Sequence, residues 1–165
     1  MGSHISQSED DGTDVQHVLD GIRRIVQGLR AASREARKTG LTSAQLFVLR
    51  RVSEADGMSI NELAARTFTH QSSVSVVASE LAARRFIDRR LDPRDRRRRL
   101  LVLRAAGRRA LASAPPAAQE RLVDAVLTLS PSARRHTAAA LRRMADAISV
   151  RRRPAMFFEE RRKRA

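Results

Sequence analysis

Four consecutive arginines, Arg96–Arg99, run directly into a short apolar segment, Leu100–Leu103. Residues 84–109 as a whole contain twelve arginines and only three aspartates. Such a local excess of positive charge favours a polyanionic partner, because neutralising phosphates releases condensed counterions. Most charge runs, however, are simply a solvated surface. The segment by itself therefore leaves two interpretations open, a contact with nucleic acid and an ordinary solvated run.

A second group of residues suited to recognition carries short, uncharged polar side chains and lies upstream of the arginines. Its members are His70, Gln71, Ser72, Ser73 and Ser75. Glutamine can pair with adenine, and serine can meet either a base or a phosphate. If these residues begin a helix, its first amides would also attract phosphate. The simpler alternative is an amphipathic helix with a serine-rich outer face, since Val74 and Val77 fall on the opposite side.

The composition limits the kind of polyanion. The formal net charge is +15, although the first twenty residues carry five acidic side chains and no basic one. Thirty-one arginines against two lysines indicate a compositional bias, so some arginines are incidental. Five phenylalanines, with no tryptophan or tyrosine, argue against a platform that stacks unpaired bases. A double-stranded partner therefore fits the composition better than a single-stranded one.

No residues suggest catalysis, a cofactor or a metal. The four histidines, at positions 4, 17, 70 and 136, have no ligand-like spacing. The absence of cysteine excludes disulfides and thiolate metal sites. No nucleophile is paired with a base, and no glycine-rich loop could cradle a phosphate. We therefore expect a protein that is not an enzyme, with no catalytic residue, no cofactor and no metal.

The chain also lacks the marks of a membrane or secreted protein. No apolar run approaches the ~20 residues that span a bilayer. The polar, acidic start is unlike a secretory signal, and Gly-Ser-His at residues 2–4 resembles the remnant of a cloning tag. We expect a cytoplasmic protein with no membrane partner, whose residues 1–13 form a disordered acidic segment.

Helix starts are visible as capping boxes, in which a Ser or Thr is followed three residues later by Gln or Glu. The three pairs are Thr13 with Gln16, Thr42 with Gln45, and Ser59 with Glu62. The first predicts a helix to Lys38 that stops at Gly40. Its apolar stripe consists of Val15, Val18, Leu19, Ile22, Val26 and Leu29. The second helix is predicted to end near Asp56, and a fourth, capped by Thr69, to span residues 70–84.

A hairpin and two further helices follow. Two short strands, 86–91 and 100–103, flank a turn that begins Asp92-Pro93, which predicts a β-hairpin. Residues 105–129 show helical spacing that Pro115-Pro116 must interrupt. Ser130-Pro131 begins a last helix, with serine as the cap. The apolar stripe of that helix consists of Ala138, Leu141, Met144, Ala145 and Ile148.

This order predicts a mainly α fold with a small β-hairpin: a winged helix-turn-helix lobe plus long dimerisation helices. The arginine run then lies in the wing, where arginine can enter a narrow minor groove. Asp92 and Asp95 would pair with arginines there and fix the shape of the loop. The helix at 70–84 becomes the recognition helix, and the two apolar stripes predict an isologous homodimer.

Residues 42–109 resemble the MarR family of bacterial transcription regulators. The resemblance lies in LTSAQLFVLRRV, SINELAARTFTHQSSVSVVASELAARRFIDRR, DPRDRRRRLLVL and the AAGRRAL that follows, and the flanking helices extend it over residues 14–149. It implies a dimer built from the first and last helices, with a winged lobe on each side. It further implies a repressor of a pseudo-palindromic operator in double-stranded DNA. A small anionic aromatic or lipophilic effector would relieve that repression.

The resemblance also implies roles for individual residues. The expected DNA contacts are Thr69, His70, Gln71, Ser72, Ser73, Ser75, Arg94, Arg96 and Arg98. The residues expected to organise the wing are Asp92, Asp95 and Arg97. Candidate effector contacts, chosen by helix membership alone, are Leu29, Ser33, Phe47 and Arg50.

Two positions depart from the family pattern. Arg85 stands where the family commonly has a glycine after the recognition helix, and Arg104 stands where it commonly has a threonine cap. Both changes concern local geometry and neither touches an expected DNA contact.

The expected divisions after the first segment are a dimerisation helix (14–40), the DNA-binding domain (41–104), further dimerisation helices (105–149) and a basic tail (150–165). The tail either docks on the partner subunit or is disordered. The alternative function is a non-specific architectural protein of the nucleoid type, which the net charge of +15 equally supports.

Overall fold

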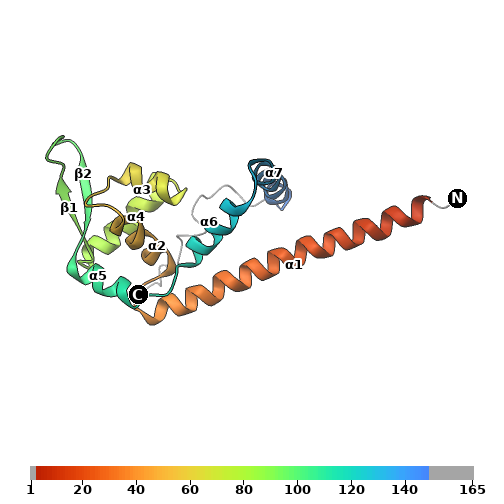
Figure 1. Cartoon of the computed structure of the whole chain (residues 1–165), viewed down its shortest axis with the longest axis horizontal. Helices are drawn as coiled ribbons and strands as arrows, with labels where there is room; N and C mark the ends of the chain where they lie inside the picture. Colours follow the sequence, from red (N-terminus) through yellow and green to blue (C-terminus); the bar gives the residue numbers. More distant parts are fainter. Residues whose placement is uncertain (1–2, 149–165) are drawn as a thin grey trace.

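The computed structural model of the chain describes residues 3–148. Within that range the predicted mainly α fold with a small β-hairpin is confirmed. The elements are α1 (Ser3–Lys38), α2 (Ser43–Ser53), α3 (Ile60–Thr67), α4 (Gln71–Ala83), β1 (Ile87–Leu91), β2 (Arg99–Leu103), α5 (Ala105–Ala112), α6 (Ala118–Thr128) and α7 (Pro131–Ala147). Figure 1 shows α2–α5 and the hairpin gathered into one lobe, from which α1 extends as a single long rod. The predicted tail, 150–165, lies outside the described residues.

Two of the predicted capping boxes, together with the predicted serine cap, set helix starts in the structure. The Thr42 hydroxyl accepts the Gln45 amide at 3.1 Å, and the Gln45 side chain accepts the Thr42 amide at 3.1 Å. Ser59 and Glu62 make the same reciprocal pair at the start of α3. Ser130 caps α7 by accepting the Ala133 amide at 3.2 Å. These starts depend on contacts three residues apart, which is why the sequence spacing reveals them.

The predicted start of the first helix at Thr13 is wrong. Helix α1 already begins at Ser3, so the described part of the segment expected to be disordered is helical. No proline interrupts residues 3–12. Gly12 costs a helix only about 1 kcal/mol, which is too little to end it. A capping box inside a segment that can continue as helix does not have to act as a cap.

The predicted cap of the recognition helix is also wrong, by one residue. His70 is the N-cap of α4, and its side chain makes no capping hydrogen bond. The Thr69 hydroxyl instead donates to the Thr67 carbonyl at 2.9 Å, within the turn between α3 and α4. Helix α2 ends at Ser53, slightly before the predicted end near Asp56.

The hairpin is confirmed, with its strand ends moved by one residue. Strands β1 and β2 pair antiparallel, from Ile87 opposite Leu103 to Leu91 opposite Arg99. Met58 extends the sheet by one bridge, since its amide donates to the Leu101 carbonyl at 3.1 Å and the Leu101 amide returns the bond at 2.7 Å. The apolar segment beside the arginine run therefore ties the wing into the lobe.

The lobe closes its own hydrophobic core around α2. The core side chains exposed by 1% or less include Leu46, Phe47, Val48, Leu49, Val52, Leu63, Val74, Leu81, Ile87 and Leu101. Arg99 at the start of β2 is exposed, whereas Leu101 is buried and Leu100, Val102 and Leu103 are half-buried. The apolar residues of β2 anchor the hairpin in the lobe, and the arginines beside them lie outside it.

Both departures from the family pattern are accommodated locally. Arg85 adopts the left-handed backbone with φ of 60°, so arginine takes the conformation that a glycine would adopt more easily. Arg104 is the N-cap of α5 without a capping side-chain bond, and its guanidinium donates to the Asp88 carboxylate at 2.7 Å instead. The predicted break at Pro115-Pro116 is confirmed, because α5 ends at Ala112 and α6 begins at Ala118.

Candidate nucleic-acid interface

The N-terminal half of α4 presents polar side chains on its outer face and anchors the other face in the core. Gln71 and Ser72 are exposed, and Ser73 and Ser75 are half-buried. On the inner face, Val74 and Val77 are 0% and 3% exposed. The predicted amphipathic pattern is therefore present, and the uncharged polar group lies where a groove could receive it. His70 stands exposed just before the helix.

Two residues on this surface were missed by the sequence reasoning. Val76 is 59% exposed on the outer face of α4. Arg89 of β1 donates to the Ser79 hydroxyl at 2.6 Å, which brings a guanidinium beside the third turn of the helix. The helical spacing from Ser72 to Val76 could have revealed the first residue. Only the packing of β1 against α4 reveals the second.

The two wing aspartates hold backbone amides. The Asp92 carboxylate accepts the Arg94 amide at 2.9 Å, and Asp95 does the same for Arg97, also at 2.9 Å. The backbone of Arg98 closes the turn, since its carbonyl accepts the Asp92 amide and its amide donates to the Asp95 carbonyl. The expectation that these carboxylates pair with arginines and fix the shape of the loop is met in part. Both carboxylates fix the turn through backbone amides two residues on, and Asp92 also lies 3.9 Å from the Arg98 guanidinium.

The arginines of the wing fall into two kinds. Arg94, Arg96 and Arg97 are exposed at the tip. Arg98 instead reaches back, donating to the Glu62 carboxylate at 3.1 Å and lying 3.9 Å from Asp92. Its guanidinium thus joins the wing to the start of α3.

The contacts of Glu62 with Ser59 and Arg98 stabilise the charged form of its carboxylate. Its pKa is lowered from 4.5 to about 2. The main cause is hydrogen bonding from the Ser59 hydroxyl and amide, and the hydrogen bond and charge of Arg98 add to it. One carboxylate therefore completes a helix cap and holds the wing.

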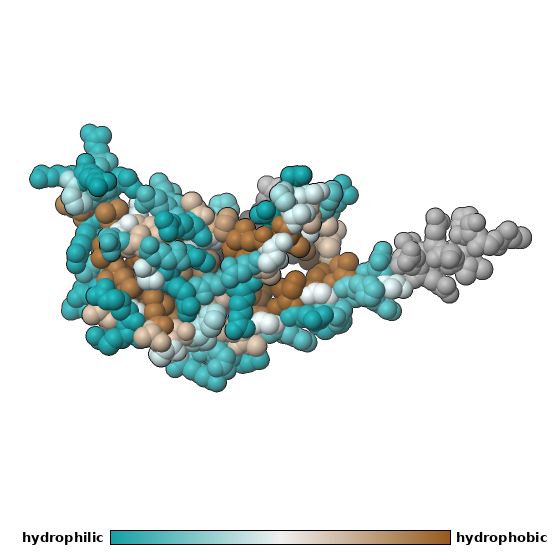
Figure 2. All heavy atoms as spheres, in the orientation of Figure 1, coloured by the Kyte–Doolittle hydropathy of each residue, from teal (hydrophilic) through white to brown (hydrophobic). Residues whose placement is uncertain are grey.

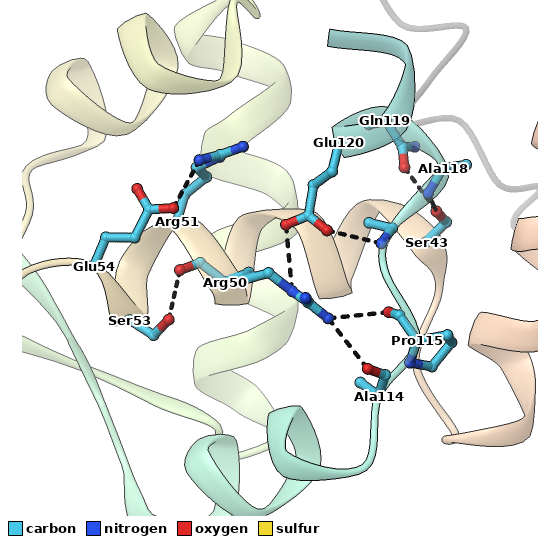
Figure 3. Close-up of polar contacts among 11 residues, drawn as sticks. Ser43, Arg50, Arg51, Ser53, Glu54, Ala114, Pro115, Ala118, Gln119 and Glu120 are labelled. Carbon is cyan, nitrogen blue, oxygen red and sulfur yellow. Dashed lines mark hydrogen bonds and ion pairs between the residues drawn. The ribbon is translucent and has the colours of Figure 1, made fainter. Parts of the chain in front are cut away.

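A polar network joins the lobe to α6 (Figure 3). Arg50 of α2 donates to the carbonyls of Ala114 and Pro115 at 3.3 and 3.0 Å and pairs with Glu120 at 3.3 Å. Glu120 in turn accepts the Ala117 amide at 2.9 Å. These contacts fix the proline-containing connection between α5 and α6 against the lobe.

A second part of this network joins the start of α2 to the start of α6. The Ser43 hydroxyl donates to Gln119 at 2.7 Å and accepts the Ala118 amide at 3.0 Å (Figure 3). Ser43, Gln119 and Glu120 are all buried. Buried polar groups that satisfy one another specify one arrangement of the elements carrying them.

The predicted effector contacts are not brought together. Phe47 is only 1% exposed, within the core, and the Arg50 guanidinium is held by the network just described. Leu29 instead lines a shallow cavity of about 200 Å³ between α1 and α6, together with Ile25 and Leu122. Arg24 and Arg121 stand at the same cavity. Ser33 is half-buried on α1 and is not among its lining residues.

Two further findings apply to the described residues. No group of three or more His, Asp or Glu there could hold a metal ion. No helix among them combines the length and apolar character needed to cross a bilayer.

Three helices with an exposed recognition helix, followed by an arginine-rich hairpin, define a winged helix-turn-helix DNA-binding protein. A model of the MarR family matches residues 39–98. A probable transcriptional regulator from Pseudomonas aeruginosa is 30% identical, with a TM-score of 0.53, over 74% of this chain and 92% of that one. The chain belongs to the MarR family and is a DNA-binding transcription regulator.

Two other solved structures extend the comparison. BpsR of Bordetella bronchiseptica is 28% identical over 80% of this chain and 93% of that one, with a TM-score of 0.54. MarR of E. coli in its apo form is 18% identical over 77% and 93%, with a TM-score of 0.53, and shows the likeness of the fold alone. No curated protein matches the chain.

Proposed function

We propose that this regulator is a homodimeric repressor that reads a pseudo-palindromic operator and leaves it when a small anionic molecule binds. The observation that carries the proposal is that two chemically different elements lie on one surface. An uncharged polar helix face adjoins an arginine hairpin, and Arg89 bonded to Ser79 ties the two together. In this proposal α4 reads base edges, and the wing holds phosphates or enters the minor groove.

The charge distribution supports sequence-specific binding over a general affinity for DNA. Helix α4 contains no lysine or arginine, so its contribution depends on hydrogen bonds and shape. Gln71, Ser72, Ser73 and Ser75 are the proposed base or phosphate contacts of α4, with Thr69 and His70 at its entrance. Arg94 and Arg96 are the proposed groove contacts of the wing. Arg98, by contrast, is proposed to position the wing along with Asp92, Asp95 and Arg97.

The homodimer is proposed from the apolar faces that a single chain leaves open. On α1, Val15, Val18 and Leu19 are 58%, 48% and 51% exposed. On α7, Leu141 is 51% exposed, and Ile148, the C-cap of that helix, is 73% exposed. Figure 2 shows hydrophobic residues gathered over α1, α6 and α7, away from the wing. Patches of this kind mark interaction sites, and a second copy offers the same faces in return.

Two-fold symmetry would present two recognition helices to DNA. The half-sites would then lie about one helical turn apart, roughly 34–36 Å, as an inverted repeat.

The effector is proposed to occupy the cavity between α1 and α6. Its leucine and isoleucine walls suit an apolar ring, and Arg24 and Arg121 suit a carboxylate. The structure of BpsR concerns regulation of its DNA binding by 6-hydroxynicotinic acid, an aromatic carboxylic acid. The Arg50–Glu120 network joins α6 to α2, and α2 packs against α4, so a ligand that moves α6 would act on α4 through α2.

Selection of bound duplexes from random DNA, followed by titration of the enriched and a scrambled duplex, tests the proposal. We expect a preference of roughly 10³-fold or more for the enriched duplex. Equal affinity for both duplexes would identify a non-specific architectural protein instead. Aromatic carboxylates added to the preformed complex should release the enriched duplex.

A further inference from the structure

Val76 is an exposed apolar side chain on a helix that otherwise buries its valines. Val74 and Val77 are 0% and 3% exposed, whereas Val76 is 59% exposed. Single apolar residues on a surface are ordinary and carry no meaning alone. The position of Val76 gives it meaning, because it lies four residues after Ser72 and so follows it on the outer face of α4.

The polar groups beyond Val76 are already used within the protein. The Ser79 hydroxyl donates to the Ser75 carbonyl at 2.7 Å and accepts Arg89 at 2.6 Å. The Glu80 carboxylate accepts the Gln45 side chain at 3.0 Å. Val76 is therefore an exposed side chain on the middle of α4 that no intrachain hydrogen bond engages, and a surface that meets this part of α4 would contact it.

The chemistry of the major groove restricts what such a side chain can recognise. Thymine is the one base that presents an apolar group there, its 5-methyl. The commonest readers of guanine are arginine and lysine, and α4 carries neither. Gln71 at the start of the helix has the amide that pairs with adenine.

We propose that Val76 packs against a thymine 5-methyl group and that, with Gln71, it makes α4 a reader of A·T base pairs. The inference rests on the proposed function, in which α4 enters the major groove. It adds the class of base pair at the centre of each half-site and a residue that determines it.

Deoxyuridine provides the test, because it removes only the methyl group of thymine. Each thymine of one half-site of the selected operator is replaced in turn, and binding of the full-length protein is measured by fluorescence anisotropy. For the wild type we expect about a fourfold loss at one or two thymines, the factor implied by exposing one methyl group. In Val76→Ala, which lacks both γ methyl groups, those same replacements should have the smallest effect, and in Val76→Thr, which keeps one of them, an intermediate effect.

Gln71→Ala is the matched control. It should weaken binding to the operator while keeping the full deoxyuridine penalty, because it leaves Val76 intact. Circular dichroism should show all three variants folded, since both side chains are on the surface.

The outcomes separate this inference from the proposed function. Specific operator binding with equal deoxyuridine penalties in the wild type and Val76→Ala overturns the role of Val76 alone. If the selected half-sites contain only G·C pairs at their centre, the proposal that α4 recognises A·T base pairs is overturned. If the selection enriches no sequence, the proposed function is contradicted, and this inference is contradicted as well.

Discussion

Apolar side chains are buried in the lobe but exposed on the long helices α1 and α7. In the lobe, Leu63 and Leu81 are 0% exposed, and the core is complete within one chain. On α1 and α7, Leu19 and Leu141 are each 51% exposed. Helical periodicity looks the same in both regions. The difference teaches that one apolar stripe pattern can serve either a finished core or an exposed face, which is the face proposed here to form the dimer.

The same contrast holds for arginines. Arg50 and Arg98 are held by carboxylates within the chain, at 3.3 and 3.1 Å. Arg94 and Arg96 stand exposed at the wing tip. Arginines engaged in the chain fix the relative positions of elements, and exposed ones remain available for phosphate.

The largest expected effect comes from placing a charge on the open face of α1. Val18→Asp would put a carboxylate in the proposed dimer interface, where it cannot be desolvated cheaply. Light scattering at micromolar concentration should show a monomer, and operator affinity should fall by at least about 100-fold because one recognition helix binds alone. Phe68→Asp is the control for the oligomeric state alone, since Phe68 is 70% exposed on the lobe but adjoins the proposed DNA contact Thr69. If both variants remain dimers, the exposed apolar face of α1 is not the dimer interface.

The recognition helix and the wing should respond differently to truncation. Gln71→Ala should cost roughly 1–3 kcal/mol on the operator and much less on scrambled DNA, with the salt slope nearly unchanged. Arg96→Ala should weaken both duplexes and reduce the log–log salt slope by about one. Titrating both variants on both duplexes at several salt concentrations distinguishes reading from positioning. A Gln71→Ala loss that is equal on the two duplexes would remove α4 as the specificity element.

The network between the two regions should affect the stability of the fold, with an effect no larger than that of Gln71→Ala on binding. Glu120→Ala removes the carboxylate that pairs with Arg50 and that accepts the Ala117 amide. We expect a loss on the order of 1–3 kcal/mol in the free energy of unfolding, because a buried amide and a partly exposed guanidinium lose their acceptor. Urea denaturation measures it. Glu35→Ala, on the exposed side of α1, is the control and should change the value by less than about 0.5 kcal/mol.

The smallest effect concerns the pH dependence of the Glu62 contacts. A carboxyl whose folded pKa of about 2 lies below its usual 4.5 stabilises the fold above pH 4.5 and loses that contribution as the pH falls toward 2. The urea midpoints of the wild type and Glu62→Gln should therefore converge across that window. Because Glu62 is exposed to solvent, the convergence should be small.

The cause of the Glu62 shift can be separated by titration. NMR titration of Glu62 should show a larger rise in its pKa in Ser59→Ala than in Arg98→Gln, because the Ser59 hydrogen bond is the largest cause of the lowering. The reverse order would mean that the wing contact, and not the helix cap, holds this carboxylate.

The sequence by itself determined the features that depend on neighbours along the chain. Thr42, Ser59 and Ser130 cap helices through residues three positions away. The prolines at 115 and 116 break a helix because neither has an amide to donate. The apolar segments on either side of the Asp92-Pro93 turn predict a hairpin whose strands anchor the charged turn. Short-range geometry follows from spacing, so these elements could be predicted.

Only the tertiary structure decided which partner each of several equivalent arginine side chains contacts. Arg98 looks the same as Arg96 in the sequence, yet it pairs with Glu62, 36 positions away. Arg50 was predicted to line an effector site, but it holds a carbonyl 65 positions away. A long arginine side chain can reach many acceptors, and the packing of distant elements selects among them. Spacing along the chain does not predict which acceptor an arginine binds, because the acceptor is set by how the lobe, the wing and α6 pack together.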